Sequence, residues 1–351
     1  MSIDRKKTRK IKVGDLCIGG DAPVTVQSMT ISPTENLATL LPEIERLESA
    51  GCQIIRVTIP NINAAKKIPV IKKHATVPLV ADIHFNHKLA LIAIDAGIDK
   101  VRINPGNIGD SEKVRQVLQK AKIAGVPIRI GVNSGSLEKD LLKKYGHPTP
   151  AAMLESAERH IKICRDNDFH DIAVSLKSSD TYLMIAANRL FAEKYDYPLH
   201  LGVTEAGPVR QGTIKSAIGI GTLLAEGIGD TIRVSLTGDP VEEVRVGYAI
   251  LKSLNLINTG VNIVSCPTCG RTQTNVAKIA EEIEKETGQM KKKATIAVMG
   301  CVVNGPGEAR EADIGVACGK NNGVIFKKGE VIDKVPEAEI LPRLLKELAE
   351  L

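Results

Sequence analysis

Short runs of aliphatic and β-branched residues recur through the first two thirds of the chain, and most are followed by a stretch of helical periodicity. The eight runs lie at residues 24–26, 54–57, 79–83, 101–104, 128–132, 172–177, 201–204 and 232–235. Strands that alternate with helices are typical of parallel βα units, and eight such units close a (β/α)8 TIM-type barrel. The pattern therefore predicts an α/β fold that begins with this barrel.

The segments between the runs favour a barrel over an open sheet. Amphipathic stretches lie at 37–50, 90–96, 111–124, 150–167 and 240–254, with glycine at several helix ends. A doubly wound sheet would need a Gly-x-Gly-x-x-Gly turn after an early strand, and none is present there. A barrel takes about 250 residues, so we expect a barrel substrate domain at 1–255.

The last part of the chain has a different pattern. After a short linker at 255–260 we expect a strand near 261–264, a helix at 274–287, strands at 294–299 and 314–317, a hairpin around Lys328 and Gly329, and a final helix after Pro336. A chain of 351 residues exceeds what one core usually serves. We therefore predict a second, smaller α/β domain at 261–351.

Composition and charge narrow the possible functions. Hydrophobic residues make up 43% and aromatic residues 3%, with no Trp, so the core must consist of aliphatic residues, as buried parallel strands do. The net charge of +6 suits an anionic small molecule better than a nucleic acid, for which few stacking platforms exist. Neither an apolar leader nor a run of about 18 apolar residues occurs. We expect a cytoplasmic protein without a nucleic-acid or membrane partner.

Four of the predicted strands carry an arginine between aliphatic neighbours. These residues are Arg56, Arg102, Arg129 and Arg233. A buried guanidinium is costly unless it is paired, so four on converging strands suggest a shared anionic ligand. The alternative is a structural network in which they neutralise Asp82 and Glu205. We would prefer that reading for one arginine, but the set of four favours a ligand site.

Further polar residues stand where the strands end. Alternation places Asn104 on the face of Arg102, Asn133 on that of Arg129 and Ser235 on that of Arg233. Lys177 ends the sixth strand, and Thr204 and Glu205 follow the seventh. Barrel enzymes carry their sites at these strand ends and often bind phosphate in the loops after strands seven and eight, which are glycine-rich here. A phosphate-rich ligand is therefore expected.

Three cysteines in the last part of the chain form a candidate metal site. Cys266 and Cys269 make a Cys-x-x-Cys motif, and Cys301 precedes a Gly-Pro-Gly loop. No histidine follows residue 258, so a fourth ligand would be Cys318, a carboxylate such as Glu308 or an exogenous group. Three thiolates with an exchangeable fourth ligand suit a [4Fe-4S] cluster; four would suit zinc or an electron relay. A redox disulfide between Cys266 and Cys269 is a further alternative.

The chain also resembles the 4-hydroxy-3-methylbut-2-en-1-yl diphosphate synthase family. The resemblance rests on motifs at 26–30, 81–85, 102–107, 131–140, 204–207, 266–269 and 300–308, and it spans essentially the whole chain. It implies reductive opening and dehydration of 2-C-methyl-D-erythritol 2,4-cyclodiphosphate to (E)-4-hydroxy-3-methylbut-2-enyl diphosphate in isoprenoid precursor biosynthesis. The last part also resembles the cluster-bearing domains of sulfite and nitrite reductases, by analogy of fold.

The resemblance also implies roles for individual residues and partners. It implies one [4Fe-4S] cluster per chain, ligated by Cys266, Cys269, Cys301 and Glu308 rather than Cys318. The arginines, Lys177 and Asn133 would bind the diphosphate, and Glu205 would donate a proton. The chain has no room for the extra domain of the longer family members, so the resemblance implies the short bacterial form, a head-to-tail homodimer. A ferredoxin or flavodoxin would supply electrons.

Two other hypotheses compete with this one. A zinc-dependent barrel lyase or hydrolase acting on a sugar phosphate would also use Cys266, Cys269 and Cys301. A protein that only carries electrons or binds nucleic acid would not need arginines on barrel strands.

Overall fold

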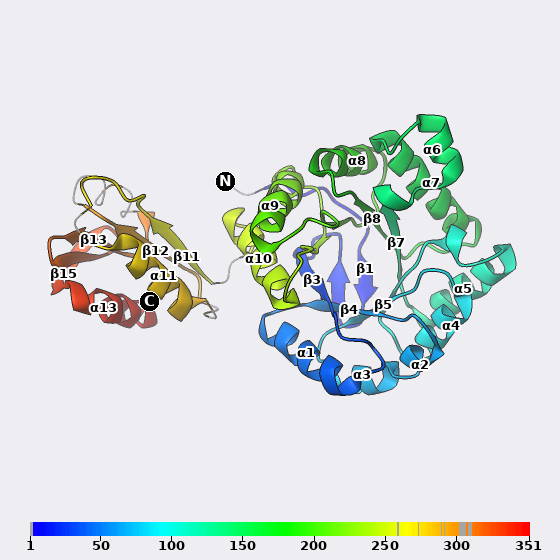
Figure 1. Ribbon diagram of the computed structural model, residues 1–351, viewed down its shortest axis with the longest axis horizontal. Coiled ribbons are helices and arrows are strands. Elements are labelled where there is room, and N and C mark those ends of the chain that lie inside the picture. Colours follow the sequence, from blue (N-terminus) through cyan, green and yellow to red (C-terminus); the bar gives the residue numbers. More distant parts are fainter. Residues whose placement is uncertain are drawn as a thin grey trace. The chain divides into compact units, whose positions relative to one another are not determined.

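The computed structural model describes residues 3–257, 260–272, 274–288, 290, 292–301, 307 and 311–351. The chain divides into two compact units, Met1–Leu256 and Ile257–Leu351. Figure 1 shows the first unit as a ring of helices around a set of strands and the second as a sheet flanked by helices.

The first unit is a parallel barrel. Its eight-stranded sheet has the order β8-β7-β6-β5-β4-β3-β10-β9, and a bridge between Val174 and Leu199 closes it. The strands are β3 (Thr25–Met29), β4 (Ile54–Thr58), β5 (Leu79–Asp82), β6 (Lys100–Arg102), β7 (Ile128–Asn133), β8 (Ile172–Lys177), β9 (His200–Leu201) and β10 (Thr231–Ile232). The predicted barrel is confirmed, although its seventh and eighth strands are only two residues long.

Helices cover the outside of the barrel. They are α1 (Leu37–Ser49), α2 (Ile62–Ala65), α3 (Ile68–His74), α4 (His87–Asp95), α5 (Ser111–Ala124), α6 (Lys139–Tyr145), α7 (Pro150–Asp166), α8 (Thr181–Lys194), α9 (Val209–Ala225) and α10 (Pro240–Ser253). Asp110, Thr149 and Asp180 cap the N-termini of α5, α7 and α8 by accepting hydrogen bonds from backbone N–H groups. These caps start the helices soon after the preceding strands or loops, which keeps the strand ends together.

A hairpin that the sequence pattern did not predict closes the floor of the barrel. Strands β1 (Ile11–Val13) and β2 (Leu16–Ile18) are antiparallel. Their buried side chains Ile11, Val13 and Ile18 form one apolar cluster with Ile54, Val80 and Ala173 of the barrel. Water is therefore excluded from the N-terminal ends of the strands, and the opposite end is left as the mouth.

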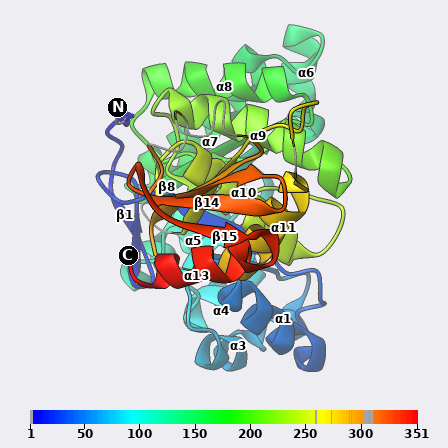
Figure 2. The ribbon, with the colours of Figure 1, turned by 90° about the vertical axis from the view of Figure 1, so that its left-hand side faces the viewer.

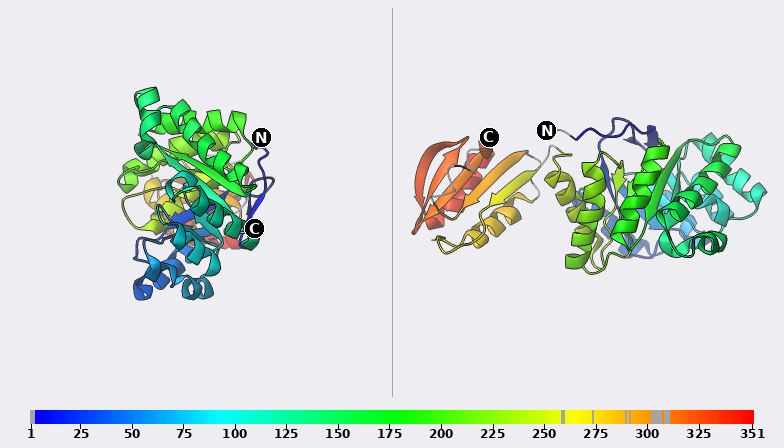
Figure 3. Two further views of the ribbon diagram at one scale, coloured as in Figure 1. Left: turned by 90° about the vertical axis from the view of Figure 1, so that its right-hand side faces the viewer. Right: turned by 90° about the horizontal axis from the view of Figure 1, so that it is seen from above.

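The second unit is a five-stranded sheet in the order β11-β12-β13-β14-β15. Its strands are β11 (Val261–Ser265), β12 (Ala294–Met299), β13 (Ile314–Gly319), β14 (Asn322–Lys327) and β15 (Glu330–Pro336). The first three are parallel, and β14 and β15 form the predicted hairpin around Lys328 and Gly329. Figure 2 shows β14 and β15 with α11 (Val276–Thr287) and α13 (Ile340–Ala349), and Figure 3 shows the same sheet from above.

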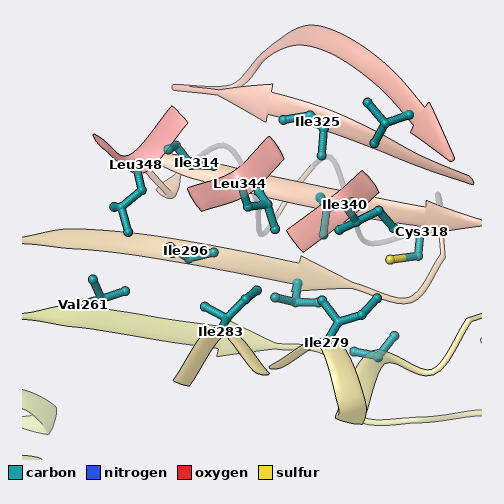
Figure 4. Close-up of a cluster of buried hydrophobic side chains, with 14 of the residues drawn as sticks. Val261, Ile279, Ile283, Ile296, Ile314, Cys318, Ile325, Ile340, Leu344 and Leu348 are labelled. Atoms are coloured by element: carbon teal, nitrogen blue, oxygen red, sulfur yellow. The ribbon is translucent and has the colours of Figure 1, made fainter. Parts of the chain in front are cut away.

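Both helices of this unit pack on one face of the sheet. Ile279 and Ile283 of α11 and Leu344 and Leu348 of α13 share a buried cluster with Ile296 of β12 (Figure 4). The amphipathic pattern of the tail therefore led to the correct strands and helices. No helix in the described ranges is both long and apolar enough to cross a membrane.

Candidate functional site

The barrel interior is lined by polar side chains in stacked layers. Strands in such a barrel are tilted, so each layer takes one residue from each of four alternate strands. The strand registers give three upper layers, and the polar strand ends follow above them. From below, the layers are Arg56, Arg102, Ser175 and Arg233; then Met29, Asp82, Gly131 and Gly202; then Thr58, Asn104, Lys177 and Ser235, with Asn133 and Thr204 above.

Asp82 holds two of the predicted arginines. Its carboxylate lies 3.9 Å from Nε of Arg56 and 3.5 Å from Nη1 of Arg102. Nε2 of His84 lies 3.4 Å from Oδ2 of Asp82. Nδ1 of His84 accepts a hydrogen bond of 3.0 Å from Nη1 of Arg102. Burial raises the pKa of Asp82, but His84, Arg56 and Arg102 outweigh it and hold that pKa well below the usual range. Asp82 is therefore an anionic anchor and not a proton donor.

The two arginines keep donors for a ligand. Nε and Nη2 of Arg56 point at Sδ of Met29, at 3.0 and 2.7 Å, and a thioether is a weak acceptor. Nη2 of Arg102 donates to the carbonyl of Gly131 at 3.2 Å. A Cβ on Gly131 would lie 2.6 Å from Nε of Arg102, so the guanidinium occupies the space that a side chain would need. The amide oxygen of Asn104 accepts from the Gly131 N–H at 2.8 Å and fixes this strand end.

Arg129 and Lys177 have no carboxylate within ion-pairing distance among the described residues. Arg129 is 1% exposed and donates to Gln27 Oε1 at 3.4 Å. Nζ of Lys177 lies close to Gly202: a Cβ added at Gly202 would be only 2.8 Å from it. Burial, and then the neighbouring Arg129, lower the pKa of Lys177. An anionic ligand would reverse this effect, since it would favour the charged amine.

Arg233 is paired with a residue that the sequence analysis missed. Glu243, in α10, accepts two hydrogen bonds from the Arg233 guanidinium, at 3.2 and 3.1 Å. Its carboxylate also accepts from Ser28 Oγ at 2.8 Å and from the Leu236 N–H at 3.1 Å. Glu243 thus holds Arg233 and ties β3 to the loop after β10.

The barrel interior carries an excess of positive charge. The cationic side chains that line it among the described residues are Arg56, Lys100, Arg102, Arg129, Lys177 and Arg233, six in number. The carboxylates paired with them are two, Asp82 and Glu243, the latter from α10. The excess of four positive charges cannot be offset by solvent where the side chains are buried. The arrangement is suited to a ligand with several negative charges.

Glu205 lies apart from this charge network. It is exposed after β9, and its φ of +51° is unusual for a residue other than glycine. It makes no ion pair with any residue in the described ranges. The alternative in which the arginines neutralise Glu205 is therefore not supported, whereas the pairing with Asp82 exists. The N–H of the adjacent Thr204 donates to Ser178 at 3.1 Å.

A pair formed by the buried His160 and the partly exposed Glu138 connects two loops of the mouth. Nε2 of His160 lies 3.3 Å from Oε1 of Glu138, and its Nδ1 accepts from the Gly106 N–H at 3.1 Å. Ser156 Oγ donates to the same Glu138 oxygen at 3.1 Å. Burial raises the pKa of Glu138, but the hydrogen bonds outweigh it and bring the pKa to about 2. The pair connects the loop after Asn104 to the loop after Asn133.

In the second unit, two of the three predicted cysteine ligands follow neighbouring parallel strands. Cys266 comes directly after β11, and its N–H donates to Val298 of β12 at 3.0 Å. Cys301 comes two residues after β12. Both lie at the carboxyl-terminal edge of the sheet, and all three cysteines are free thiols. A hydrogen bond from the backbone of Arg271 lowers the pKa of Cys269, which favours the thiolate, the form of cysteine that ligates metals.

This donor set fits an iron-sulfur cluster in its chemistry. Within the described ranges, no three His, Cys, Asp or Glu side chains are placed to hold a metal ion. Glu308, the fourth predicted ligand, lies outside the described residues, as do 302–306. Cys318 is buried in the cluster under α11 and α13, whereas Cys266 packs against the cluster on the other face of the sheet. The structure thus places Cys318 and Cys266 on opposite faces of the sheet.

Comparison with known proteins supports a single family for both units. The family model of the GcpE TIM-barrel domain matches residues 8–248, and that of the GcpE protein C-terminal domain matches residues 262–350. The chain belongs to the GcpE family.

Curated GcpE relatives match over nearly their whole length. The chain is 57% identical to a protein of Caldanaerobacter subterraneus subsp. tengcongensis, over 98% of this chain and 97% of that one. It is 56% identical to one of Clostridium perfringens, over 98% and 99%, and 54% identical to one of Geobacter sulfurreducens, over 98% of both. Each relative is named 4-hydroxy-3-methylbut-2-en-1-yl diphosphate synthase (flavodoxin).

Solved structures support the barrel as a fold. Dihydropteroate synthase of Yersinia pestis aligns with a TM-score of 0.50 at 14% identity, covering 71% of this chain and 100% of that one. The 3-dehydroquinate dehydratase of Geobacillus kaustophilus aligns with a TM-score of 0.50 at 15% identity, covering 70% and 97%. At such low identities the likeness concerns the fold alone.

Two interior residues of this GcpE barrel could have been found in the sequence but were not. Lys100 stands two positions before Arg102, so alternation places it on the same face of its strand. His200 similarly stands two positions before Gly202. Glu243 gave no such signal, because it lies on a helix beside the partly exposed Glu242.

Proposed function

We propose that this chain catalyses the reaction named for its relatives, with flavodoxin as the electron donor. 2-C-Methyl-D-erythritol 2,4-cyclodiphosphate takes up two electrons and two protons. The ring C–O bond to phosphate breaks, the neighbouring hydroxyl leaves as water, and (E)-4-hydroxy-3-methylbut-2-enyl diphosphate forms. The observation that carries the proposal is the excess of four positive charges inside a GcpE barrel.

The barrel residues bind and orient the substrate in this proposal. Arg56, Arg102, Arg129 and Lys177 hold the cyclic diphosphate, and Arg233 is kept in place by its pairing with Glu243. Asn104, Asn133, Thr204 and Ser235 line the mouth. Released charge on the diphosphate is stabilised by the same guanidinium groups, because fixed donors need no reorganisation.

Glu205 donates the proton that lets the hydroxyl leave as water. It directly follows the predicted seventh strand, it has no ion pair within the described ranges, and its exposure allows proton exchange with solvent. Glu205→Gln should lower kcat at least about 100-fold with little change in KM, as expected for loss of a general acid. Full turnover by this variant would remove the role.

The second unit is the cluster domain in this proposal. Cys266, Cys269, Cys301 and Glu308 would hold one [4Fe-4S] cluster, which supplies the two electrons one at a time. Absorption and EPR spectra of anaerobically purified protein, with iron and sulfide assays, test this. A brown protein with about four irons per chain supports the cluster. A colourless protein with one zinc per chain would refute the redox mechanism and favour the zinc-lyase alternative.

The family resemblance further suggests a head-to-tail homodimer in which each site uses the barrel of one subunit and the cluster domain of the other. Mixing Glu205→Gln subunits with Cys301→Ser subunits, both inactive alone, tests it. If sites form across subunits, mixed dimers regain activity, up to about a quarter of the wild-type value for random pairing. Sites within single chains would give no recovery, although sedimentation would still show a dimer.

A further inference from the structure

Two layers with polar side chains lie beneath the proposed substrate site. Of their residues, only Arg129 contacts the substrate in the proposed function. Extending the strand registers downward gives a layer from β3, β5, β7 and β9 and, below it, one from β4, β6, β8 and β10. The upper of the two contains Gln27, Val80, Arg129 and His200. The lower contains Ile54, Lys100, Ala173 and Thr231. The layer of Arg56, Arg102 and Arg233 separates them from the mouth.

This region is closed from below. The β1–β2 hairpin packs on Ile54, Val80 and Ala173 of the same two layers. Lys100 and His200 are 0% exposed, and Gln27 and Arg129 are each 1% exposed. Polar groups at this depth require partners, because an unsatisfied buried donor costs about 1–3 kcal/mol, and a charged one more.

Four donor nitrogens in these layers have no hydrogen-bond partner among the described residues. They are Lys100 Nζ, Gln27 Nε2, Arg129 Nε and His200 Nε2. Gln27 uses its oxygen to accept from Arg129, which leaves its amide N–H₂ group as a donor. His200 Nδ1 lies 3.2 Å from Thr231 Oγ1; with the hydroxyl donating to it, Nε2 carries the hydrogen.

The surroundings of Lys100 are cationic. The charged groups that act on it are Arg129 and Arg56, and both disfavour its charged form. His200 faces Arg129, Lys177, Lys100 and Arg56, so burial and these cations keep it neutral. No carboxylate of the described chain pairs with Lys100 or Arg129 within 4 Å. Four donor nitrogens in two adjacent layers, two of them on cations without a carboxylate partner, thus lack an acceptor among the described residues.

We propose that this donor cluster binds a monovalent anion of chloride size, beneath the proposed substrate site and sharing Arg129 with it. A single negative charge without preferred directions can accept from donors of several residues and offsets the repulsion between Lys100 and Arg129. A phosphate group carries too many oxygens and too much charge for a closed layer of this kind. The bound anion stabilises the barrel and keeps Lys100 protonated.

Bromide tests the site directly, because it replaces chloride and scatters anomalously. Crystals of the full chain, grown anaerobically with bromide as the only halide, should show an anomalous peak between Lys100, Arg129 and His200. A peak only among Arg56, Lys177 and Arg233 would assign the halide to the mouth and overturn the proposal. Water-like density without an anomalous signal would overturn it too.

Thermal unfolding supplies an independent measurement. At constant ionic strength, replacing gluconate by chloride should raise the Tm of the barrel saturably, by about 5 °C when chloride is near 100 times its Kd. Lys100→Met should abolish this rise, whereas Lys162→Met, which removes a lysine that is 74% exposed, should keep it. A rise that persists in Lys100→Met, or no rise in the wild type, would count against the site. The wild-type measurements stand even if Lys100→Met does not fold.

Discussion

The pairing of Glu243 with Arg233 offers the sharpest test of how this barrel is held together. Glu243→Gln removes one charge from a pair whose members are 4% and 17% exposed. Breaking a buried pair costs about 3–5 kcal/mol because the remaining charge stays buried. Arg233 retains some solvent access, so we expect the lower end, about 3 kcal/mol.

The loss can be measured by calorimetry and by urea unfolding followed by circular dichroism. For a unit of this size about 1 kcal/mol shifts Tm by roughly 2–4 °C, so the barrel transition should fall by about 6–12 °C. The matched control is Glu242→Gln on the same helix, whose carboxylate is 36% exposed and pairs with Arg245. An exposed pair contributes about 0–1 kcal/mol, so the control should change little.

A double-mutant cycle separates the pair from the rest of the site. Arg233→Met combined with Glu243→Gln should be less destabilised than the two single variants added together, by at least about 1 kcal/mol. The reasoning is refuted if Glu243→Gln is as stable as Glu242→Gln, or if the cycle is additive. Additivity would mean that Ser28 and Leu236, and not Arg233, are the important partners of Glu243.

Three further outcomes follow from the site. Gly131→Ala should displace the Arg102 guanidinium and raise KM at least about 10-fold, while Gly221→Ala, where a Cβ meets nothing within 4 Å, should leave KM unchanged in steady-state assays. The pKa of Glu138 is lowered to about 2 in the folded protein. The ionised carboxylate therefore stabilises the fold above about pH 4.5, and this stabilisation is lost as the pH falls toward 2. The full shift would correspond to about 3 kcal/mol. Partial exposure reduces this to about 1 kcal/mol, visible as a shallower loss of stability below pH 4.5 in Glu138→Gln. Cys318→Ala should retain the full iron content per chain and lose about 1 kcal/mol of stability, and loss of iron in that variant would show that Cys318 is a ligand.

The sequence by itself determined the eight barrel strands, the main elements of the second unit and five of the barrel helices, and it supplied the residues of the candidate site. Hydrophobic periodicity marks eight strands because buried parallel strands are aliphatic, and an arginine within such a strand is conspicuous because burial is costly. Alternation then places Asn104, Asn133 and Ser235 with these arginines. The same local pattern predicted the second unit, because each of its elements has its own period and turn residues.

Tertiary structure alone decided which groups meet. Glu243 belongs to a helix whose neighbouring carboxylate is exposed, and only closure of the barrel brings it to Arg233 across β3 and β10. The β1–β2 hairpin is too short to be recognised by periodicity, and its role as the floor arises from contact with strands far along the chain. Alternation with Arg102 could have placed Lys100 on the inner face of its strand, but only the strand registers show that its neighbours there are other cations. Closure of the barrel brings together residues that are distant in the sequence. Local sequence patterns cannot predict such partners, because they depend only on neighbouring residues.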